Sequence, residues 1–388
     1  MKVFYLDAAL RDDVGHHAPS ARALVSAFKK RGHDVVVHGM TTVSPALKHE
    51  LGVIPTFRVR TYDRVDNDPV TWPLSSFELQ AHATLEDLRT VTGYTRDDLV
   101  YYSSAQPAQF MAVTAWFHEI PEERRPRVVL EFGTDPGLDV VGQSIRLREF
   151  YTDPRPLFYR HTGRSFKPDP RFVLVTFEKT SSTVYEWLTQ HPVRTFPVPR
   201  FSDATWFDRR QQEWLTVSFL GHQRWDKGYH QVPAIIRRLL AEDDDVTVYV
   251  HNACPGELPD VQAEVRKLKG FRVTVDERAA GPKRWQELLD HSDVIVCPYV
   301  ASRFVASYSA VACEAVANGI PLVVPADTSL SRLVEGYGAG ATFGDVVDAI
   351  HRVIEGFDGM IEQARRGAER WRRDMGADKT VEAIMRLT

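Results

Sequence analysis

The residues with the clearest chemical potential lie in a short loop of the second half of the chain, Gly221–Gly228, which reads GHQRWDKG. The loop lies between an apolar strand pattern and a helical pattern, and the backbone N–H groups that open a helix attract phosphate. Arg224 adds a guanidinium fork, and Lys227 adds a compact positive charge. The loop therefore predicts a site for a pyrophosphate group.

A second candidate lies farther along, where the strand pattern Val294–Pro298 is followed by a loop and the helix pattern Ser309–Asn318. Glu314 lies inside this helix among small apolar residues, and such company favours a partly buried carboxylate with a defined role. We expect it to accept hydrogen bonds from both hydroxyls of a ribose. The backbone N–H groups that open the helix and would face phosphates belong to Tyr308, Ser309 and Ala310.

The first half of the chain carries titratable residues directly after predicted strands. Gly15, His16 and His17 lie in the first strand-to-helix loop, where an imidazole suits proton transfer or phosphate binding. Glu131 follows a buried strand pattern, and Asp135 lies shortly after it. A carboxylate at a strand end can take the proton of a hydroxyl group. We therefore expect the catalytic residues to be Glu131, Asp135 and His16.

Two acidic clusters could in principle bind a divalent metal ion. Asp66-Asn67-Asp68 has a D-x-D spacing, but Pro69 follows it and no apolar strand leads into it. The run Asp243–Asp245 lies between a helix and a strand, as in an ordinary polar turn. We therefore predict no metal site.

Strand and helix patterns alternate along almost the whole chain, which predicts parallel sheets covered by helices. In the first half, the strand patterns Val3–Leu6 and Val35–Val37 flank an amphipathic helix. Prolines cluster around 192–199 and predict a linker, after which the alternation restarts at the strand pattern Thr216–Leu220. The repetition predicts an α/β protein of two Rossmann-like domains facing across a cleft, with ligands outside the carboxyl ends of the strands.

Composition sets the broad class of the protein. The 388 residues suffice for two domains, and the net charge of −4 gives no general attraction to nucleic acid. The cysteines, Cys254, Cys297 and Cys313, lack the spacing of a zinc site or a disulfide framework. No run has the length of a membrane span or the pattern of a signal peptide, so we expect a cytoplasmic protein. The basic segment Arg365–Arg373 would allow peripheral contact with the inner face of a membrane.

Two runs carry a family resemblance: SFLGHQRWDKG at 218–228 and CEAVANGIPLVVP at 313–325. They resemble the donor-binding half of GT-B glycosyltransferases, closest to the retaining family 4, or group 1, enzymes. The resemblance is specific over 216–335 and looser over 1–40 and 172–200. It implies that Arg224 and Lys227 bind the donor diphosphate, that Glu314 binds the ribose, and that Gly15 and His17 lie near the donor phosphates.

One position departs from the family pattern. The first glutamate of the E-x7-E motif falls at position 306, where this chain has Ala306. In the family that acid contacts the transferred sugar, so retaining and inverting transfer both stay open. Arg303 lies in the same loop, and its guanidinium could pair with an acidic sugar or an extra phosphate.

The resemblance implies a hexosyltransferase-like enzyme (class EC 2.4) that moves a sugar from a nucleotide-diphosphate sugar to a hydroxyl group. The acceptor would be a glycan, a lipid-linked molecule or a small molecule. The implied role is bacterial surface glycan synthesis. It implies an acceptor domain over 1–198, a nucleotide-sugar domain over 199–370, and a last helix, 371–388, that packs back on the first domain. It implies no cofactor and no metal, because the cationic loop takes over the metal's electrostatic role. An epimerase or hydrolase of nucleotide-sugars and a non-catalytic binding protein stay as alternatives, although the aromatic stretch Tyr62–Phe77 suits acceptor recognition and favours transfer.

We expect the substitution Glu314→Ala to weaken nucleotide binding by roughly 1–3 kcal/mol, because it leaves buried ribose hydroxyls without an acceptor. Calorimetric titration of both proteins with the nucleoside diphosphate that binds the wild type measures the difference. Wild-type affinity in the variant would place the ribose elsewhere.

Overall fold

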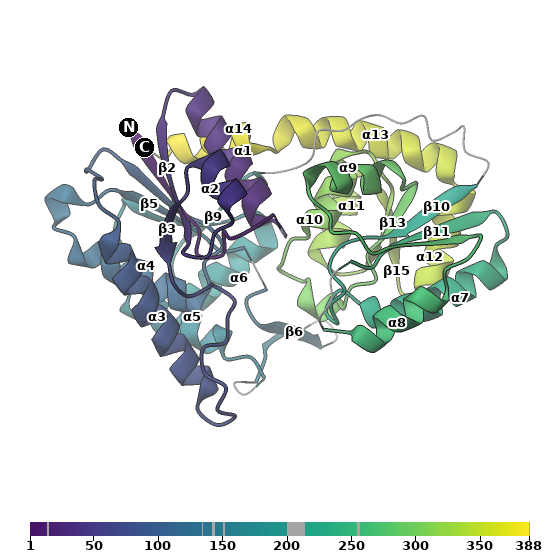
Figure 1. The fold of residues 1–388 in the computed structure, drawn as a ribbon, viewed down its shortest axis with the longest axis horizontal. Helices are drawn as coiled ribbons and strands as arrows, with labels where there is room; N and C mark the ends of the chain where they lie inside the picture. The colour runs from purple at the N-terminus through teal and green to yellow at the C-terminus, as the bar shows by residue number, and fades with distance from the viewer. Residues whose placement is uncertain are drawn as a thin grey trace. The chain divides into compact units, whose positions relative to one another are not determined.

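The computed structural model describes residues 1–13, 15–133, 135–141, 144–149, 152–199, 214–253 and 257–387. The chain divides into two compact units, Met1–Arg200 with Met375–Thr388 (unit 1) and Phe201–Asp374 (unit 2). Each unit is a parallel sheet with helices on both faces (Figure 1). Of the cysteines, Cys297 and Cys313 are buried thiols, and Cys254 lies outside the described residues.

The main sheet of unit 1 has seven strands, and every neighbouring pair is parallel. Its central strands are apolar and largely buried, as expected for a sheet that helices cover on both faces. The strand order is β3 (Ile54–Phe57), β2 (Asp34–Met40), β1 (Lys2–Leu6), β4 (Leu99–Tyr102), β5 (Arg127–Glu131), β8 (Phe172–Thr176) and β9 (Val193–Thr195). A separate antiparallel hairpin joins β6 (Leu138–Val141) to β7 (Ser144–Leu147).

Helices cover both faces of this sheet. On one side α3 (Trp72–Thr90), α4 (Pro107–Glu119) and α5 (Arg155–Ser165) lie side by side, and α6 (Lys179–Thr189) packs on α5 (Figure 1). On the other side lie α1 (His17–Lys30), α2 (Pro45–Leu51) and α14 (Ala377–Met385). The helix α1 begins at His17 and ends in two lysines that suit the negative end of its dipole.

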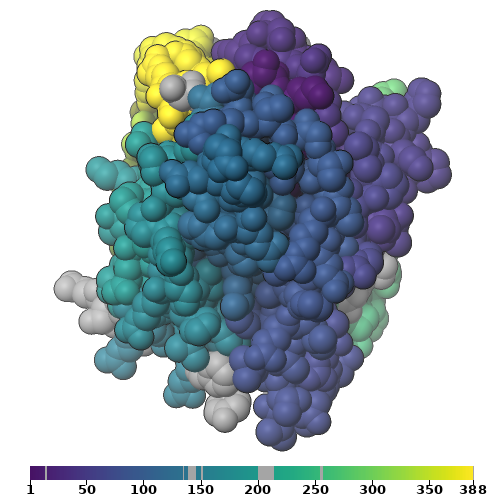
Figure 2. Space-filling view, turned by 90° about the vertical axis from the view of Figure 1, so that its left-hand side faces the viewer, coloured from purple at the N-terminus to yellow at the C-terminus, as the bar shows by residue number. Residues whose placement is uncertain are grey.

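The C-terminal helix α14 belongs to unit 1, where it packs on α1. The Arg31 guanidinium Nη1 lies 2.7 Å from Asp378 Oδ1, and Thr380 Oγ1 donates to the carbonyl of Pro197 at 2.9 Å. Figure 2 shows the C-terminal residues beside the N-terminal ones on the surface of this unit. The two ends of the chain are therefore tied to the same α/β layer.

The sheet of unit 2 has six parallel strands around a core that includes Val217, Ile236, Val248 and Ile350. The strand order is β12 (Val273–Asp276), β11 (Val246–His251), β10 (Leu215–Phe219), β13 (Val294–Val296), β14 (Leu322–Pro325) and β15 (Gly340–Phe343). One face carries α7 (Val232–Glu242), α8 (Pro259–Lys267) and α12 (Val346–Glu355). The other carries α9 (Pro282–Asp290), α10 (Ala310–Ala317), α11 (Ser329–Tyr337) and α13 (Phe357–Asp374) (Figure 1).

The basic segment Arg365–Arg373 lies on α13 and partly serves to fix that helix to its neighbours. Arg372 donates from Nε at 3.0 Å and from Nη2 at 2.7 Å to the carbonyl of Ala317, at the end of α10. The Arg370 guanidinium lies over the ring of Tyr337 in α11, 6.0 Å from its centroid. Among the described residues, no helix combines the length and apolar character needed to cross a bilayer.

Two glycines of α13 offer a matched test of helix packing. A Cβ on Gly367 would lie 2.0 Å from the carbonyl oxygen of Tyr337, whereas a Cβ on Gly359 would meet nothing within 4 Å. We expect Gly367→Ala to destabilise the protein by about 1–3 kcal/mol through overpacking. Gly359→Ala should instead stabilise it by up to about 1 kcal/mol, because alanine favours the helix. Denaturant midpoints measure both, and equal effects would contradict the close approach of α13 to α11.

Candidate functional site

A buried aspartate–histidine pair lies at the carboxyl edge of the unit 1 sheet. Asp7 directly follows β1 and has no solvent exposure, and its Oδ2 lies 2.9 Å from Nδ1 of His17, at the start of α1. Asp7 Oδ1 accepts a hydrogen bond from the backbone N–H of Ala9 at 2.8 Å. The residue His17 is only 4% exposed, and Nε2 of its ring has no hydrogen-bond partner among the described residues. Such a pair fixes the orientation of the imidazole.

Glu131 ends β5 near this pair and is also buried. Its Oε2 accepts hydrogen bonds from the Tyr101 hydroxyl at 2.7 Å and from the Ser103 hydroxyl at 3.1 Å. Burial, which disfavours the charged form, raises the pKa of Glu131 to about 7. The Tyr101 hydrogen bond opposes this shift, and the nearby charge of Asp7 adds to it. Glu131 can therefore hold or release a proton near neutral pH.

The remaining predicted residues of this edge surround the pair. His16 Nε2 lies 3.5 Å from the Ser104 hydroxyl, and the ring of Tyr62 lies 5.6 Å from that of His17. Gly15 precedes them with a φ of 87°. Ser104 has a φ of 56°, which costs energy for a residue with a side chain and is typical of functional sites.

Asp135 has a different environment. Its Oδ2 accepts from Nη1 of Arg148 at 2.6 Å, and Nη2 of Arg155 lies 3.5 Å from the same oxygen. Arg148 also lies 2.8 Å from Asp153. These ion pairs hold the loop after β5 to the β6–β7 hairpin and to the start of α5. They give Asp135 a structural role, and its predicted catalytic role stays a prediction.

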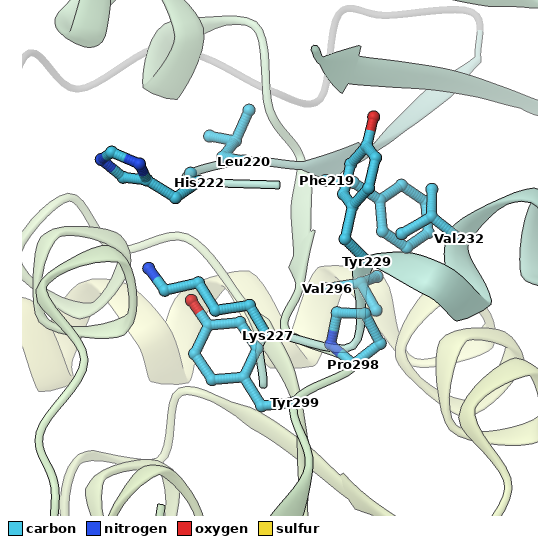
Figure 3. A pocket seen from close by; sticks show the side chains of 10 residues that line it. Phe219, Leu220, His222, Lys227, Tyr229, Val232, Val296, Pro298 and Tyr299 are labelled. Atoms are coloured by element: carbon cyan, nitrogen blue, oxygen red, sulfur yellow. The ribbon is translucent and has the colours of Figure 1, made fainter. Parts of the chain in front are cut away.

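In unit 2, the predicted phosphate loop follows β10 at the carboxyl edge of the sheet. A pocket there is lined by Gly221, His222, Lys227 and Tyr299, together with apolar side chains of the core (Figure 3). The Lys227 ammonium lies 5.5 Å from the centroid of the Tyr299 ring. Gly228 has a φ of 66°, and a Cβ there would overlap the carbonyl oxygen of Pro298. The loop can therefore close against the end of β13 only with glycine at this position.

Arg224, the other predicted cation of this loop, points to a neighbouring carboxylate. Its Nε donates to Oδ1 of Asp226 at 2.9 Å, and its Nη2 contacts Oδ2 of the same residue. The structure therefore brings Lys227 into the pocket and pairs Arg224 with Asp226.

The helix α10 contributes the second predicted donor element. Ser309 caps it, because its hydroxyl accepts from the backbone N–H of Ala312 at 3.3 Å and lies 3.3 Å from the Tyr299 hydroxyl. Tyr308 and Ala310 flank this cap, so their N–H groups lie at the helix start as predicted. Glu314 lies inside α10 and is 1% exposed. Arg303 ends the short 3-10 helix η4 (Ala301–Arg303), and Ala306 is buried in the same loop.

The D-x-D cluster has a structural explanation. Asp68 Oδ1 accepts from the backbone N–H groups of Val70 at 2.8 Å and Thr71 at 2.9 Å, at the start of α3. Asp66 Oδ1 accepts from the backbone N–H of Asp68 at 2.9 Å. Within the described ranges, no three His, Cys, Asp or Glu side chains gather closely enough to hold a metal ion.

No protein-family model matches the sequence, and no curated protein matches it either. Solved structures do match. A trehalose-6-phosphate synthase from Burkholderia multivorans aligns with a TM-score of 0.64 and 11% identity over 100% of this chain and 96% of that one. A spinosyn rhamnosyltransferase complexed with thymidine diphosphate aligns with a TM-score of 0.52 and 17% identity over 99% and 100%. A structure assigned as a UDP-N-acetylglucosamine 2-epimerase from Listeria monocytogenes aligns with a TM-score of 0.60 and 11% identity over 99% and 94%.

These likenesses establish the fold. The two parallel α/β units have the architecture of GT-B glycosyltransferases, which confirms the predicted fold class. At these identities the alignments carry no residue roles. The donor and catalytic residues named above therefore rest on the geometry of this chain.

The sequence interpretation missed three residues that the geometry brings into these sites: Asp7, His222 and Asp226. Asp7 directly follows a strand pattern, as Glu131 does, so the rule that selected Glu131 could have found it. His222 and Asp226 lie inside the loop singled out for Arg224 and Lys227. No pattern in the sequence shows that Arg224 pairs with Asp226, because that depends on how the loop closes.

The raised pKa of Glu131 predicts a pH dependence of stability. Its folded-state pKa of about 7 exceeds the ordinary value of 4.5, so the carboxyl stabilises the fold at low pH and this contribution is lost as the pH rises through about 7. The variant Glu131→Gln cannot ionise at this position. We expect its free energy of unfolding to rise by about 2–3 kcal/mol relative to that of the wild type as the pH increases from about 5 to about 8. Denaturant unfolding at both pH values measures this change. Parallel pH profiles of the two proteins would contradict it.

Proposed function

We propose that this protein is a glycosyltransferase that moves a sugar from a nucleotide-diphosphate sugar to a hydroxyl acceptor. The observation that carries the proposal is the pocket at the carboxyl edge of the unit 2 sheet, where the ammonium of Lys227 lies beside Tyr299. The Tyr299 hydroxyl in turn lies 3.3 Å from the hydroxyl of Ser309, the cap of α10. This pocket occurs in a fold shared with nucleotide-sugar enzymes. The thymidine diphosphate complex of the rhamnosyltransferase supports a nucleoside diphosphate as the ligand class.

In the proposed reaction, unit 2 holds the donor. A cation of the Gly221–Gly228 loop stabilises the negative charge that develops on the leaving diphosphate, which is often the largest single contribution to catalysis. The N–H groups of Ser309 and Ala310 lie at the start of α10, where helix ends favour anions. Glu314 would accept the ribose hydroxyls, and Arg303 would contact an acidic sugar or a further phosphate.

Unit 1 would hold the acceptor and supply the base. His17 would take the hydroxyl proton on Nε2, while Asp7 holds Nδ1 and stabilises the imidazolium. The acceptor oxygen then bonds to the anomeric carbon as the bond to the diphosphate breaks. Glu131 and His16 flank the pair as further proton carriers. This arrangement suits an inverting displacement, which agrees with Ala306 in place of the glutamate of retaining relatives.

The chain's resemblance to family 4 enzymes supports the finer parts of the proposal. These are a role in bacterial surface glycan synthesis, a cytoplasmic location with contact at the inner membrane face, and transfer without metal or cofactor. The epimerase-like structural neighbour favours one alternative, in which the same donor is epimerised or hydrolysed without an acceptor. Ala306 favours another, a binding protein without catalysis.

Calorimetric titration with UDP, GDP, ADP, CDP and dTDP, each with and without Mg²⁺, tests the donor site. We expect one diphosphate to bind selectively in the micromolar range, and binding without the metal would support a cationic loop in its place. If none of the five nucleoside diphosphates binds, the proposed function is wrong.

We expect His17→Gln to reduce turnover of the donor by about 10²–10⁴-fold, because glutamine cannot accept the proton. Donor affinity should stay at the wild-type level. His49→Gln is a matched control, since His49 is exposed on α2 and should leave turnover unchanged. Wild-type turnover in His17→Gln would show that another group is the base.

A further inference from the structure

The ring of Tyr62 links the proposed base to a positively charged side chain. Its centroid lies 5.6 Å from that of the His17 ring, and the guanidinium carbon of Arg60 lies over the same ring, 5.7 Å from its centroid. Tyr62 is 40% exposed, so part of the residue is open to solvent. A ligand that covers the exposed part of Tyr62 would therefore lie close to both the imidazole and the guanidinium.

Arg60 and Tyr62 belong to the segment that connects β3 to α3 (Figure 1). Between them, the backbone N–H of Thr61 donates to the carbonyl of Ala8 at 3.2 Å, two residues after the end of β1. The backbone N–H of Asp63 donates to the carbonyl of Arg60 at 3.1 Å and closes a turn. The backbone of this segment is therefore fixed to the carboxyl edge of the unit 1 sheet, where ligands of α/β folds bind.

Arg60 differs from neighbouring arginines of unit 1 in its partners. Nε of Arg58 lies 2.6 Å from Oδ1 of Asp87, and Nε of Arg22 lies 2.6 Å from Oε1 of Glu50. No carboxylate of the described residues forms an ion pair with Arg60, and its Nε is buried without a hydrogen-bond partner among them. A buried donor left unpaired costs about 1–3 kcal/mol, so we expect this one to bind a ligand.

Two further buried polar atoms of this edge have no hydrogen-bond partner in the described part of the chain. They are Oγ1 of Thr61, which is 2% exposed, and Nε2 of His17. A guanidinium only donates hydrogen bonds, so Arg60 requires an acceptor on the ligand. At the other end, the carboxylate of Asp7 contacts the His17 ring and would repel a negative group. The edge therefore favours a ligand with its negative charge at Arg60 and a neutral group at His17.

We propose that the acceptor carries an oxyanion, a phosphate or a carboxylate, which Arg60 binds while a hydroxyl of the same molecule lies at Nε2 of His17. The inference rests on the proposed function and deepens it by naming the chemical class of the acceptor. The planar fork of a guanidinium matches both oxyanions. The exposed part of Tyr62 then supports the body of the acceptor between its two polar ends. A neutral sugar lacks the charged contact, so Arg60 selects against it.

The test is calorimetric titration of the full chain with glucose-6-phosphate, mannose-6-phosphate, glucuronic acid, glucose and mannose. Vesicles of phosphatidylcholine, with and without phosphatidylinositol, present a phosphate and hydroxyl groups on a lipid, and sedimentation measures their binding. The variant is Arg60→Gln, and the matched control is Arg96→Gln. Arg96 is exposed, precedes β4 at the opposite edge of the sheet, and donates to the backbone carbonyl of Glu122 at 2.6 Å. Thermal unfolding of each variant checks that it is folded.

We expect the wild type to bind at least one oxyanion ligand about tenfold or more tightly than its neutral counterpart, because the charged contact adds to the affinity. Arg60→Gln should weaken that binding about tenfold or more, and Arg96→Gln should match the wild type. Arg60-dependent binding of a soluble sugar would support a free acceptor, and such binding to phosphatidylinositol vesicles alone would support a lipid-linked one. Equal binding of neutral and anionic ligands, unchanged binding in Arg60→Gln, or no binding of any ligand would overturn the inference.

The proposed function is tested separately by titration with nucleoside diphosphates. If none of them binds while an oxyanion ligand still binds through Arg60, the proposed function fails and the oxyanion site stands. If a nucleoside diphosphate binds and the oxyanion ligands do not, the inference fails and the proposed function stands with an acceptor of another class.

Discussion

All strands of both main sheets run parallel to their neighbours, and this constraint determines where chemistry can occur in the protein. Parallel strands require crossover connections, so helices cover both faces of each sheet and leave only the strand ends for ligands. The carboxyl ends of neighbouring strands then meet at one edge. In unit 1 that edge gathers Asp7, Ser104 and Glu131 from three strands distant in sequence, and in unit 2 it gathers Gly221 and Pro298.

The same constraint buries polar groups, which must then satisfy one another. Asp7 is held by His17 and by a backbone N–H, and Glu131 by two hydroxyls. Behind them the rings of Tyr5 and Tyr101 stack with centroids 5.8 Å apart, so β1 and β4 hold their registers firmly. A rigid sheet therefore fixes the orientation of His17 before any substrate arrives, as the proposed role of a base requires.

Much of the fold could be predicted from the sequence, because the buried strands are continuous apolar runs. The patterns Val3–Leu6 and Thr216–Leu220 match β1 and β10 to within one residue at each end. The helix α3 was missed, and part of it was assigned to an aromatic recognition stretch, because its buried face includes Gln80, Thr84 and Asp87 and so lacks a clear apolar period. Several candidate residues lie directly after strands, as their positions in the sequence indicate, but pairings such as Asp7–His17 and Arg224–Asp226 were not predictable. They depend on loop closure, which sequence periodicity does not record.

The central claim is that a sugar passes from a nucleotide to a hydroxyl acceptor, and a mass balance tests it most directly. The wild-type protein is incubated with the sugar form of the nucleotide that it binds and with glycolipid and glycan acceptors extracted from bacterial cells. Mass spectrometry then quantifies released diphosphate, free sugar, nucleotide-sugar isomers and glycosylated acceptor. The account predicts one sugar on the acceptor for each diphosphate released. Recovery of the sugar as free, hydrolysed sugar, or as an epimer still attached to the nucleotide, would contradict it.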